Sequence, residues 1–365
     1  MSGTLNVVFV TEPNAWHVEP WLKICAGHPA VASVTLAHLA DPAGETALLA
    51  RRVLGDKLRS THEDVAAALG AAANATLGIV TLEPWRTPAA CAQLLSAGCH
   101  VIYEKPGATS VEALRALVTL AGQQHRHLMM ALANRAQPHL GWARQAIASG
   151  QIGDVWSVDA RMVVRDRLVL GFQEHGGGWL FSRERGGGGF LTFLGCHIID
   201  AVAWLTAQPI AAIAGFTGKV HEHPLEVEDT AAFAFRLANG AFGSFLGGYN
   251  LPQDDFYSVA IYGSEGWLQT DWETSAVGAK AVRCYVRRGP DGAPMQWTET
   301  VASLPPERDM YWAFGDACFA AALGRAAPPV TAEEGLHMLQ VIHAVYGASV
   351  SGVSQRLPVP DGALA

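Results

Sequence analysis

A lysine stands where a buried strand ends, in the segment Val101–Gly107, VIYEKPG. Its apolar residues predict a strand of a parallel sheet that ends at Glu104 and Lys105. Ligands of open α/β sheets bind just outside the carboxyl ends of the strands, and lysine is rarely placed there unless its charge is needed. We therefore predict that Lys105 is a site residue. The alternative is that Glu104 and Lys105 lie in a solvated loop.

A histidine follows a run of glycines about ninety residues later, in Gly186–Leu205, GGGGFLTFLGCHIIDAVAWL. His197 titrates near neutral pH, which suits a side chain that accepts or returns a proton during catalysis. Asp200 lies one helical turn later, where a carboxylate either orients the imidazole or forms polar surface. The alternative for His197 is a hydrogen-bonded histidine inside the fold.

Together these two motifs resemble the Gfo/Idh/MocA family of NAD(P)-dependent sugar and cyclitol oxidoreductases, whose members carry E-K-P and then a glycine run followed by G-x-H-x-x-D. Thr230–Leu237 and Ala260–Asp271 are also similar to the family's second domain. The resemblance implies that Lys105 bridges the substrate hydroxyl and the nicotinamide ribose, and that His197 accepts or returns the proton. The family's aspartate, four residues before the histidine, is Phe193 here, so the sequence lacks a carboxylate at that position.

The resemblance also implies a dinucleotide site, but the turn after the first strand differs from the usual pattern. A G-x-G-x-x-G turn brings backbone amides close to the pyrophosphate, whereas Thr11–His17, TEPNAWH, contains no glycine. Pro13 removes one amide donor, and Glu12 adds negative charge unless it points away. Thr11 and Asn14 offer a hydroxyl and an amide in place of the glycines.

Further residues at the strand ends are predicted to contact the cofactor. Asp41 ends the second strand, where a carboxylate binds a ribose hydroxyl and favours NAD over NADP; alternatively, it caps a helix. The family's threonine–proline–asparagine turn is altered to LEPWRTP. Within this turn Glu83 and Trp85 are candidates, and Trp85 either stacks on a flat ring or fills the crevice. Glu104 and Lys105 complete the set, with NAD as the expected cofactor and NADP as the alternative.

The candidates for the substrate come from the second half of the chain. Five arginines precede the glycine run or lie next to it: Arg161, Arg165, Arg167, Arg183 and Arg185. We select Arg165, because a guanidinium holds anionic or polyhydroxylated groups by paired hydrogen bonds, although most of these charges are expected to be solvated. Asp200, Trp179 and Tyr249 are the other candidates. Aromatic faces suit the C–H surface of sugars, and packing is the alternative for both aromatic residues.

The composition indicates a soluble, two-domain protein. The chain has 365 residues and is therefore too long for one typical core, and half of its residues are hydrophobic, which is enough for well-buried sheets. A net charge of −8 disfavours nucleic acid and anionic membranes as partners. The amino terminus has no basic n-region and no later run reaches about 18 uninterrupted apolar residues, so we expect no signal peptide, no membrane span and a cytoplasmic location. The six cysteines are scattered, so we expect buried thiols and no metal site.

Residues 1–133 are predicted to form a Rossmann-like, doubly wound parallel sheet that binds the dinucleotide. Apolar, β-branched runs alternate there with helical stretches, as in βαβ units. The expected strands are Leu5–Val10, Ser33–Leu39, Ala75–Leu82, Val101–Tyr103 and Leu128–Leu132. The expected helices are Ala15–Ala26, Ala89–Ala97 and Val111–Gln124.

Residues 134–365 are predicted to form a mostly antiparallel, open-sheet α/β domain for substrate binding and oligomerisation. After a helix over Pro138–Ser149, short turns link most of the strands. These strands are Val155–Val164, Ala211–Val220, Ala231–Leu237, Ala241–Tyr249, Phe256–Tyr262 and Ala281–Arg288. Two helices, Tyr311–Leu323 and Glu333–Val350, are expected to pack back on the body, and a loop is expected around Trp179.

Three functions are compatible with these features. The first is an NAD(P)-dependent oxidoreductase acting on a secondary alcohol or ketone of a sugar, glycoside, cyclitol or related polyol. The missing glycines and Phe193 leave open a lyase, epimerase or hydrolase on the same scaffold. The third is a non-catalytic partner subunit. The expected partners are a polyol or sugar-like molecule and further copies of the chain, in a homodimer or homotetramer formed through the second domain's sheet.

Overall fold

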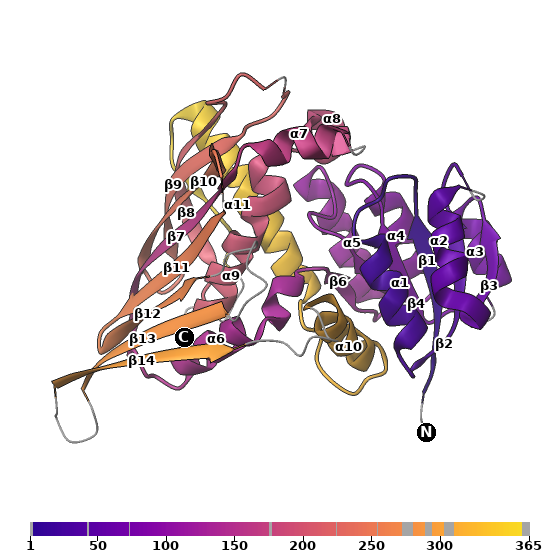
Figure 1. Cartoon of the computed structure of the whole chain (residues 1–365), viewed down its shortest axis with the longest axis horizontal. Helices are drawn as coiled ribbons and strands as arrows, with labels where there is room; N and C mark the ends of the chain where they lie inside the picture. Colours follow the sequence, from indigo (N-terminus) through magenta and orange to yellow (C-terminus); the bar gives the residue numbers. More distant parts are fainter. Residues whose placement is uncertain are drawn as a thin grey trace. The chain divides into compact units, whose positions relative to one another are not determined.

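The structure is a computed structural model that describes residues 3–41, 44–72, 74–174, 177–223, 225–253, 255–271, 280–288, 294–302 and 310–359 (Figure 1). The chain forms two compact units. Unit 1 comprises Met1–Ala133, Glu184–Gly187 and Pro306–Leu336, and unit 2 comprises Asn134–Arg183, Gly188–Pro305 and His337–Ala365. The division into domains at residue 133 remains a prediction. The short segment and the helix from the carboxyl-terminal part that join unit 1 were not expected from the sequence.

Unit 1 is built on a parallel sheet of six described strands in the order β3-β2-β1-β4-β5-β6 (Figure 1). The strands are β1 (Leu5–Thr11), β2 (Val31–His38), β3 (Leu58–His62), β4 (Leu77–Thr81), β5 (His100–Tyr103) and β6 (Leu128–Met130). The strand order reverses between β1 and β4, and ligands of such sheets bind at the carboxyl ends next to this reversal. The predicted doubly wound parallel sheet is confirmed.

Helices α1 (Val18–Gly27), α2 (Glu45–Leu54), α3 (Val65–Ala71), α4 (Thr87–Ser96) and α5 (Val111–Gln123) connect these strands. Two of them begin at side-chain caps, because Asp64 accepts a hydrogen bond from the Ala67 amide and Ser110 accepts one from the Ala113 amide. Such caps satisfy amides that the first helical turn leaves unpaired. The starts of α3 and α5 are therefore encoded locally.

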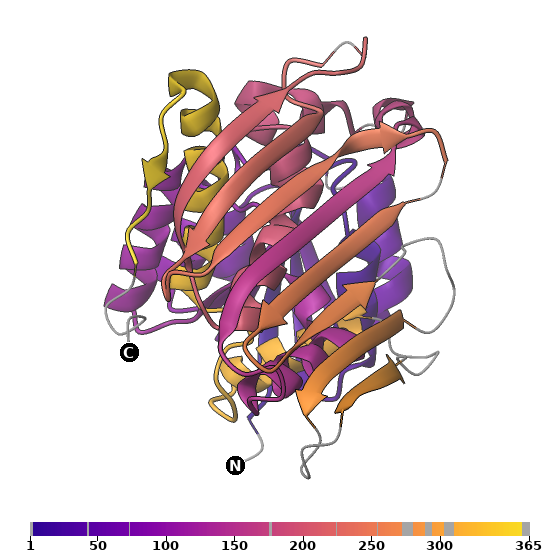
Figure 2. The ribbon, with the colours of Figure 1, turned by 90° about the vertical axis from the view of Figure 1, so that its left-hand side faces the viewer.

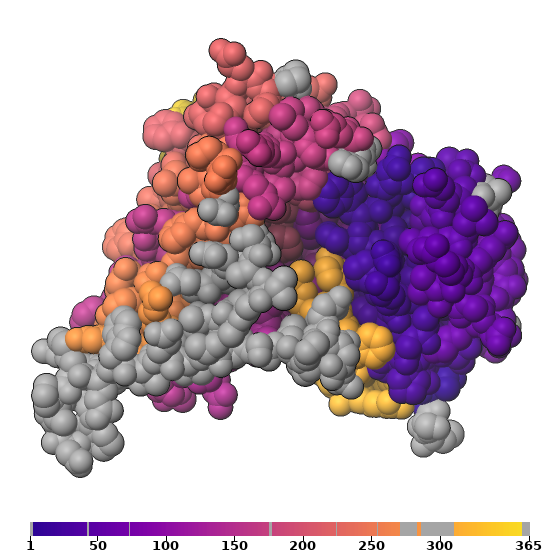
Figure 3. Space-filling view, viewed as in Figure 1, coloured from indigo at the N-terminus to yellow at the C-terminus, as the bar shows by residue number. Residues whose placement is uncertain are grey.

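Helix α10 (Met310–Ala322) completes unit 1 by packing on α1. The rings of Trp21 and Tyr311 meet edge to face at 5.7 Å, and Gly27 lies directly against the Trp312 ring. In the space-filling view, this golden segment lies against the indigo residues of the amino-terminal part (Figure 3). The sequence predicted that both carboxyl-terminal helices pack back on the body; α10 lies on α1 and is grouped with unit 1.

Unit 2 is built on a sheet of nine described strands in the order β14-β13-β12-β11-β7-β10-β9-β8-β15. Its neighbours are antiparallel except for β7 and β10, which are parallel, so the predicted mostly antiparallel sheet is confirmed. The strands are β7 (Val155–Arg165), β8 (Ile210–Gly218), β9 (Thr230–Leu237), β10 (Phe242–Leu251), β11 (Phe256–Gly263), β12 (Gly266–Asp271), β13 (Lys280–Arg288), β14 (Pro294–Ala302) and β15 (Gln355–Arg356).

One face of this sheet carries the helices, which lie behind the strands in Figure 2. They are α6 (Pro138–Ala148), α9 (Cys196–Thr206) and α11 (Ala332–Ser351), whose residues from His337 onward belong to unit 2. Alternation along β9 turns Phe233, Phe235 and Leu237 toward this side. No described helix of unit 2 lies over the other face in Figure 2.

The segment around Trp179 is helical rather than an open loop. A 3₁₀ turn spans Gly177–Phe181, between α7 (Arg167–Glu174) and the four-residue α8 (Arg183–Gly186). The expected loop is therefore wrong as a description of these residues.

One helical stretch among the described residues, Arg183–Thr206, is long and apolar enough to cross a membrane by length and composition. However, 78% of its most apolar window is buried inside the protein, which is typical of the core helix of a soluble protein.

Candidate functional site

Three glutamates follow the carboxyl ends of β1, β4 and β5 in unit 1, at the strand-order reversal. Glu12, Glu83 and Glu104 are 3%, 9% and 7% exposed, so their charges are largely removed from water. Buried carboxylates require partners. These partners determine what the strand ends can bind.

Glu104 is bonded to α1. One carboxylate oxygen lies 3.0 Å from His17 Nδ1, and the other accepts the Trp21 Nε1 hydrogen at 2.9 Å. Burial opposes ionisation of Glu104, but the charge of His17, the two hydrogen bonds and the nearby Lys105 together hold its pKa below the ordinary value. Glu104 thus fixes the start of α1 to the end of β5. Its predicted contact with a cofactor remains a prediction.

Lys105 follows Glu104 and is itself buried, with 7% of its surface exposed. The next turn requires glycine, because Gly107 has φ of +84° and a Cβ there would collide with the Tyr103 ring. The turn therefore folds back over β5 and keeps Lys105 at the strand end. The solvated-loop alternative for Glu104 and Lys105 is wrong.

Glu12 is directed toward the end of β4. Its carboxylate accepts hydrogen bonds from the Glu83 amide at 2.5 Å and from Arg86 NH1 at 2.6 Å. Burial raises the pKa of Glu12, although the Glu83 amide and Arg86 act in the opposite direction. The negative charge expected in the turn is thus present and is paired with Arg86.

Glu83 is held by an arginine about a hundred residues away. Both of its oxygens accept from Arg185, which belongs to unit 1 through the segment Glu184–Gly187, and Trp85 Nε1 donates to it at 2.9 Å. The hydrogen bond to Glu83 raises the pKa of Arg185. Trp85 is half exposed and the Arg86 guanidinium lies 5.6 Å from its ring centroid. No local sequence pattern indicates these two ion pairs.

Unpaired polar atoms are buried at the ends of β1 and β2. Thr11 and His38 face each other in the register of these strands. Within the described part of the chain, the Thr11 hydroxyl and both His38 ring nitrogens are buried without a hydrogen-bond partner. Burial lowers the pKa of His38, against the effect of nearby Asp41.

Asp41 is exposed just after β2. Its carboxylate packs against Gly44, where a Cβ would overlap it. Gly44 is the N-cap of α2, and its amide donates to the Asp41 carbonyl oxygen at 3.2 Å. The ribose contact and the helix-capping alternative for Asp41 both remain predictions.

These residues fit a dinucleotide in part. Asp41 suits a ribose hydroxyl, Thr11 is a buried hydroxyl without a partner, and α1 begins at His17 without a side-chain cap. Asn14 lies in the same turn with φ of +59°. A glycine-rich site has no negative charge in this turn, whereas Glu12 adds one, which Arg86 offsets. The group would be held by Thr11, Asn14, Asp41 and the first amides of α1.

In unit 2, Glu228 anchors the start of the helix that carries His197. It accepts hydrogen bonds from the Gly189 and Leu191 amides and from the Tyr346 hydroxyl, each at 2.9 Å. Burial raises the pKa of Glu228. These contacts place a carboxylate at the amino-terminal end of a helical stretch, where negative charge is favourable.

The glycine run permits this close approach. A Cβ on Gly188 would meet the Tyr346 hydroxyl, and one on Gly189 would meet the Glu228 carbonyl oxygen. A π-helical turn over Leu191–Gly195 then leads into α9, whose second residue is His197. Sequence reasoning missed Glu228 because its partners lie 37 to 118 residues away.

Asp200 forms a buried ion pair with Arg135. Its carboxylate accepts from Arg135 Nε at 3.0 Å and from NH2 at 2.6 Å, and both side chains are about 95% buried. Asp200 is therefore not polar surface. Phe193, at the position of the family's aspartate, packs edge-on against Phe172 at 4.9 Å.

The remaining substrate candidates differ in their surroundings. Arg165 is partly exposed and lies 3.8 Å from Asp255. Trp179 is partly buried in its 3₁₀ turn. Tyr249 is fully buried and contacts Phe190 edge-on at 5.3 Å, which supports the packing alternative for it. The substrate roles of these residues remain predictions.

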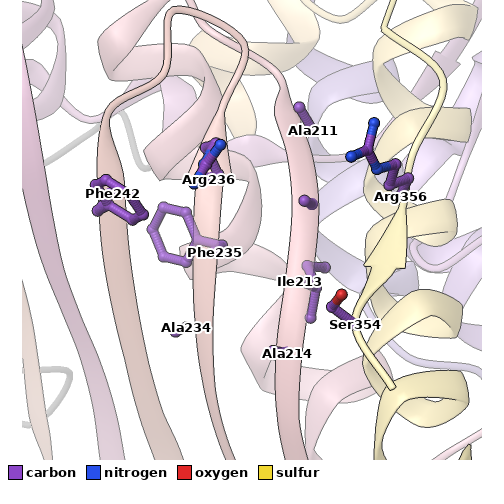
Figure 4. Close-up of a pocket in the computed structure, with 10 residues that line it drawn as sticks. Ala211, Ile213, Ala214, Ala234, Phe235, Arg236, Phe242, Ser354 and Arg356 are labelled. Carbon is purple, nitrogen blue, oxygen red and sulfur yellow. The ribbon is translucent and has the colours of Figure 1, made fainter.

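All six cysteines are free and buried, as predicted. In the part of the chain that the structure describes, no group of three His, Cys, Asp or Glu side chains is placed to hold a metal ion. A shallow groove of about 410 Å³ lies on the sheet of unit 2, lined in part by Arg236, Phe242 and Arg356. Figure 4 shows the Arg236 guanidinium next to Phe242, 4.8 Å from its ring centroid.

Comparison with known families gives two matches. Residues 14–132 match an oxidoreductase family with an NAD-binding Rossmann fold, GFO_IDH_MocA, and residues 141–269 match the GFO/IDH/MocA C-terminal domain.

The names of two curated relatives indicate that those proteins act on sugars. The 1,5-anhydro-D-fructose reductase of Ensifer adhaerens is 26% identical over 72% of this chain and 74% of its own length. The levoglucosan dehydrogenase of Pseudarthrobacter phenanthrenivorans is 24% identical over 48% of this chain and 50% of its own. In the matches to three relatives, the aligned part spans 62%, 50% and 41% of their length, less than two thirds.

Solved structures share the fold over nearly the whole chain. The aldose-aldose oxidoreductase of Caulobacter crescentus superposes with a TM-score of 0.76 at 21% identity, covering 97% of this chain and 100% of that one. A levoglucosan dehydrogenase in complex with NADH and levoglucosan superposes with a TM-score of 0.79 at 16% identity, over 97% of this chain and 100% of that one.

Proposed function

The chain belongs to the Gfo/Idh/MocA oxidoreductase family, and on this premise we propose that it is an NAD(P)-dependent dehydrogenase or reductase of a sugar, glycoside, cyclitol or related polyol. It is an oxidoreductase with an NAD-binding Rossmann-fold domain. The proposed step is oxidation of a secondary alcohol, or reduction of the matching ketone.

The observation that carries the proposal is the buried position of Lys105 at the end of β5 in the NAD-binding unit. A cation there stabilises negative charge as it develops on a substrate oxygen. Glu104 and His17 lie beside it and add further polar groups to this strand end. His197 in unit 2 takes the hydroxyl proton during oxidation and returns it during reduction.

When bound, the nicotinamide supplies the hydride acceptor or donor. Asp41 supports NAD over NADP, because its exposed carboxylate would repel a 2′-phosphate. A sugar-like substrate is supported by the names of the relatives, which include a levoglucosan dehydrogenase and a 1,5-anhydro-D-fructose reductase. Arg165, Trp179, Asp200 and Tyr249 are the proposed substrate-side residues.

The test is a titration of the protein with NADH and NADPH, followed by energy transfer from tryptophan to the nicotinamide. We expect saturable binding, tighter for NADH, and then NADH formation with a panel of sugars, anhydrosugars and cyclitols in the presence of NAD. Absence of binding by both dinucleotides at millimolar concentration would contradict the proposal.

A non-redox function on the same scaffold is the second candidate. It is supported by Phe193, which leaves the family's aspartate position without a carboxylate, and by Glu12 in the glycine-free turn. A lyase, epimerase or hydrolase would convert its substrate without net formation of NADH. Product analysis alongside the absorbance of reduced nicotinamide distinguishes the two candidates.

We also propose that the protein forms a homodimer or homotetramer through the open face of the unit 2 sheet. Strand register places five large, exposed apolar side chains on that face: Phe216, Phe242, Leu246, Phe256 and Tyr262. Such a face needs a cover. A cytoplasmic location is supported by the six free cysteines.

A further inference from the structure

The β1–α1 turn carries its own anion at the strand-order reversal. The Glu12 carboxylate, 4% exposed, accepts from one backbone amide and one guanidinium, those of Glu83 and Arg86. Amides and guanidinium groups at a strand end are also the donors that bind phosphate oxygens. Glu12 thus engages a donor set that suits a dinucleotide phosphate.

A second guanidinium near this turn, that of Arg185, is held by another glutamate. Arg185 binds both oxygens of Glu83. Arg86 is the N-cap residue of α4 and its side chain is 31% exposed, so it can turn toward a ligand at the ends of β1 and β4. An anion bound there would be repelled by the Glu12 charge and attracted by the more exposed Arg86 guanidinium.

We propose that Arg86 is the phosphate-binding cation of this glycine-free turn, and that Glu12 is an internal competitor that weakens binding of the dinucleotide pyrophosphate. This inference rests on the proposed function. In the absence of ligand, Glu12 neutralises Arg86 and stabilises the turn. On binding, Arg86 exchanges the carboxylate for a phosphate oxygen, so affinity depends on the charge of Glu12.

That exchange leaves the Glu12 carboxylate buried next to Glu83 without its counter-charge, which is energetically unfavourable. Burial already raises its pKa, so the neutral form is easier to reach than for an exposed glutamate. A glutamine at this position keeps an oxygen acceptor for the Glu83 amide and removes the charge. It therefore separates the role of the charge from that of the hydrogen bond.

The test compares Glu12→Gln with the wild type and with Glu333→Gln, using NADH, ADP and adenosine as probes. Glu333 is an exposed glutamate in the first turn of α11, so it provides a matched control away from the β1–α1 turn. We expect Glu12→Gln to bind NADH and ADP about tenfold more tightly. Adenosine, which has no phosphate, should bind unchanged, and the control should match the wild type.

Arg86→Met provides a second variant. Alone it should weaken ADP and NADH binding about tenfold without changing adenosine binding, and in the Glu12→Gln background it should abolish the gain. Circular dichroism verifies that each variant is folded, and Arg86→Met decides the question if Glu12→Gln does not fold. ADP binding that is the same in Arg86→Met as in the wild type, or no tighter in Glu12→Gln, overturns the inference.

The failures of this inference and of the proposed function are distinguishable. If the wild type binds NADH saturably and neither variant changes its affinity, only the inference fails. If neither the wild type nor Glu12→Gln binds any dinucleotide at millimolar concentration, both fail.

Discussion

At the scale of residues, the strand ends of unit 1 combine opposite charges that lie far apart in sequence. Glu12 pairs with Arg86, Glu83 with Arg185, and Glu104 with His17. Each glutamate follows an apolar strand, so its place at the sheet edge could be predicted. The pairings could not, because they join residues separated by 74, 102 and 87 positions, and no local pattern encodes such contacts.

Replacement of Lys105 tests the catalytic assignment. Lys105→Met removes a cation from the end of β5, and we expect kcat for NADH formation to fall by about 10² to 10³-fold, since one charge-stabilising group is lost. Lys23→Met is the control, because Lys23 is exposed on α1 and pairs with Glu19 on the surface. Its kcat should equal that of the wild type. Equal kcat values for the two variants would contradict the assignment.

At the scale of elements, the helix that carries His197 depends on a carboxylate from outside it. The glycine run was predicted from sequence as a motif, but its physical reason is contact: Gly188 and Gly189 let Tyr346 and Glu228 approach the backbone. Strand β3 was missed because its sequence, LRSTH, has one apolar residue and so shows no clear apolar pattern.

Glu228→Ala should destabilise the protein strongly. It leaves two buried amides and a partly buried hydroxyl without their acceptor, and we expect a loss of about 2 to 4 kcal/mol in the free energy of unfolding. Glu222→Ala, at an exposed position nearby in sequence, should change it by less than about 0.5 kcal/mol. Urea unfolding measures both. Similar values for the two variants would show that Glu228 does not hold the helix start.

His337 should make stability depend on pH. Its Nε2 accepts the Ile210 amide hydrogen, joining α11 to β8, and burial lowers its pKa to about 4. The unfolded chain therefore binds a proton between about pH 6.5 and 4 that the folded chain excludes, and stability falls as pH decreases through this range. We expect a contribution of about 3 kcal/mol to this loss.

His337→Gln keeps an acceptor for the amide but does not titrate. Its free energy of unfolding should therefore fall less between pH 6.5 and 4 than that of the wild type. Parallel stability–pH curves for the two proteins would contradict the role of His337.

At the scale of the whole molecule, the open sheet of unit 2 predicts self-association. Phe216 and Leu246 both lie opposite Ala232 in the strand register, on the face without helices in Figure 2. The double variant Phe216→Ser with Leu246→Ser should shift the mass measured by light scattering toward the monomer, because it removes apolar contact area. Val350→Ser, an exposed change on α11, should keep the wild-type mass. A monomeric wild type would contradict this prediction.

The two units are built from alternating segments of the chain, and this affects folding during synthesis. The polypeptide changes unit after residues 133, 183, 187, 305 and 336, so no single cut yields two complete halves. During ribosomal synthesis the amino-terminal sheet emerges early, but Trp21 and Ile24 on α1 gain their cover of Tyr311, Phe314 and Gly315 only when α10 has left the exit tunnel. Synthesis of the Rossmann unit thus begins first but is complete only after most of unit 2 has been made. An amino-terminal fragment released before α10 is synthesised would leave Trp21 without its cover and exposed to chaperones.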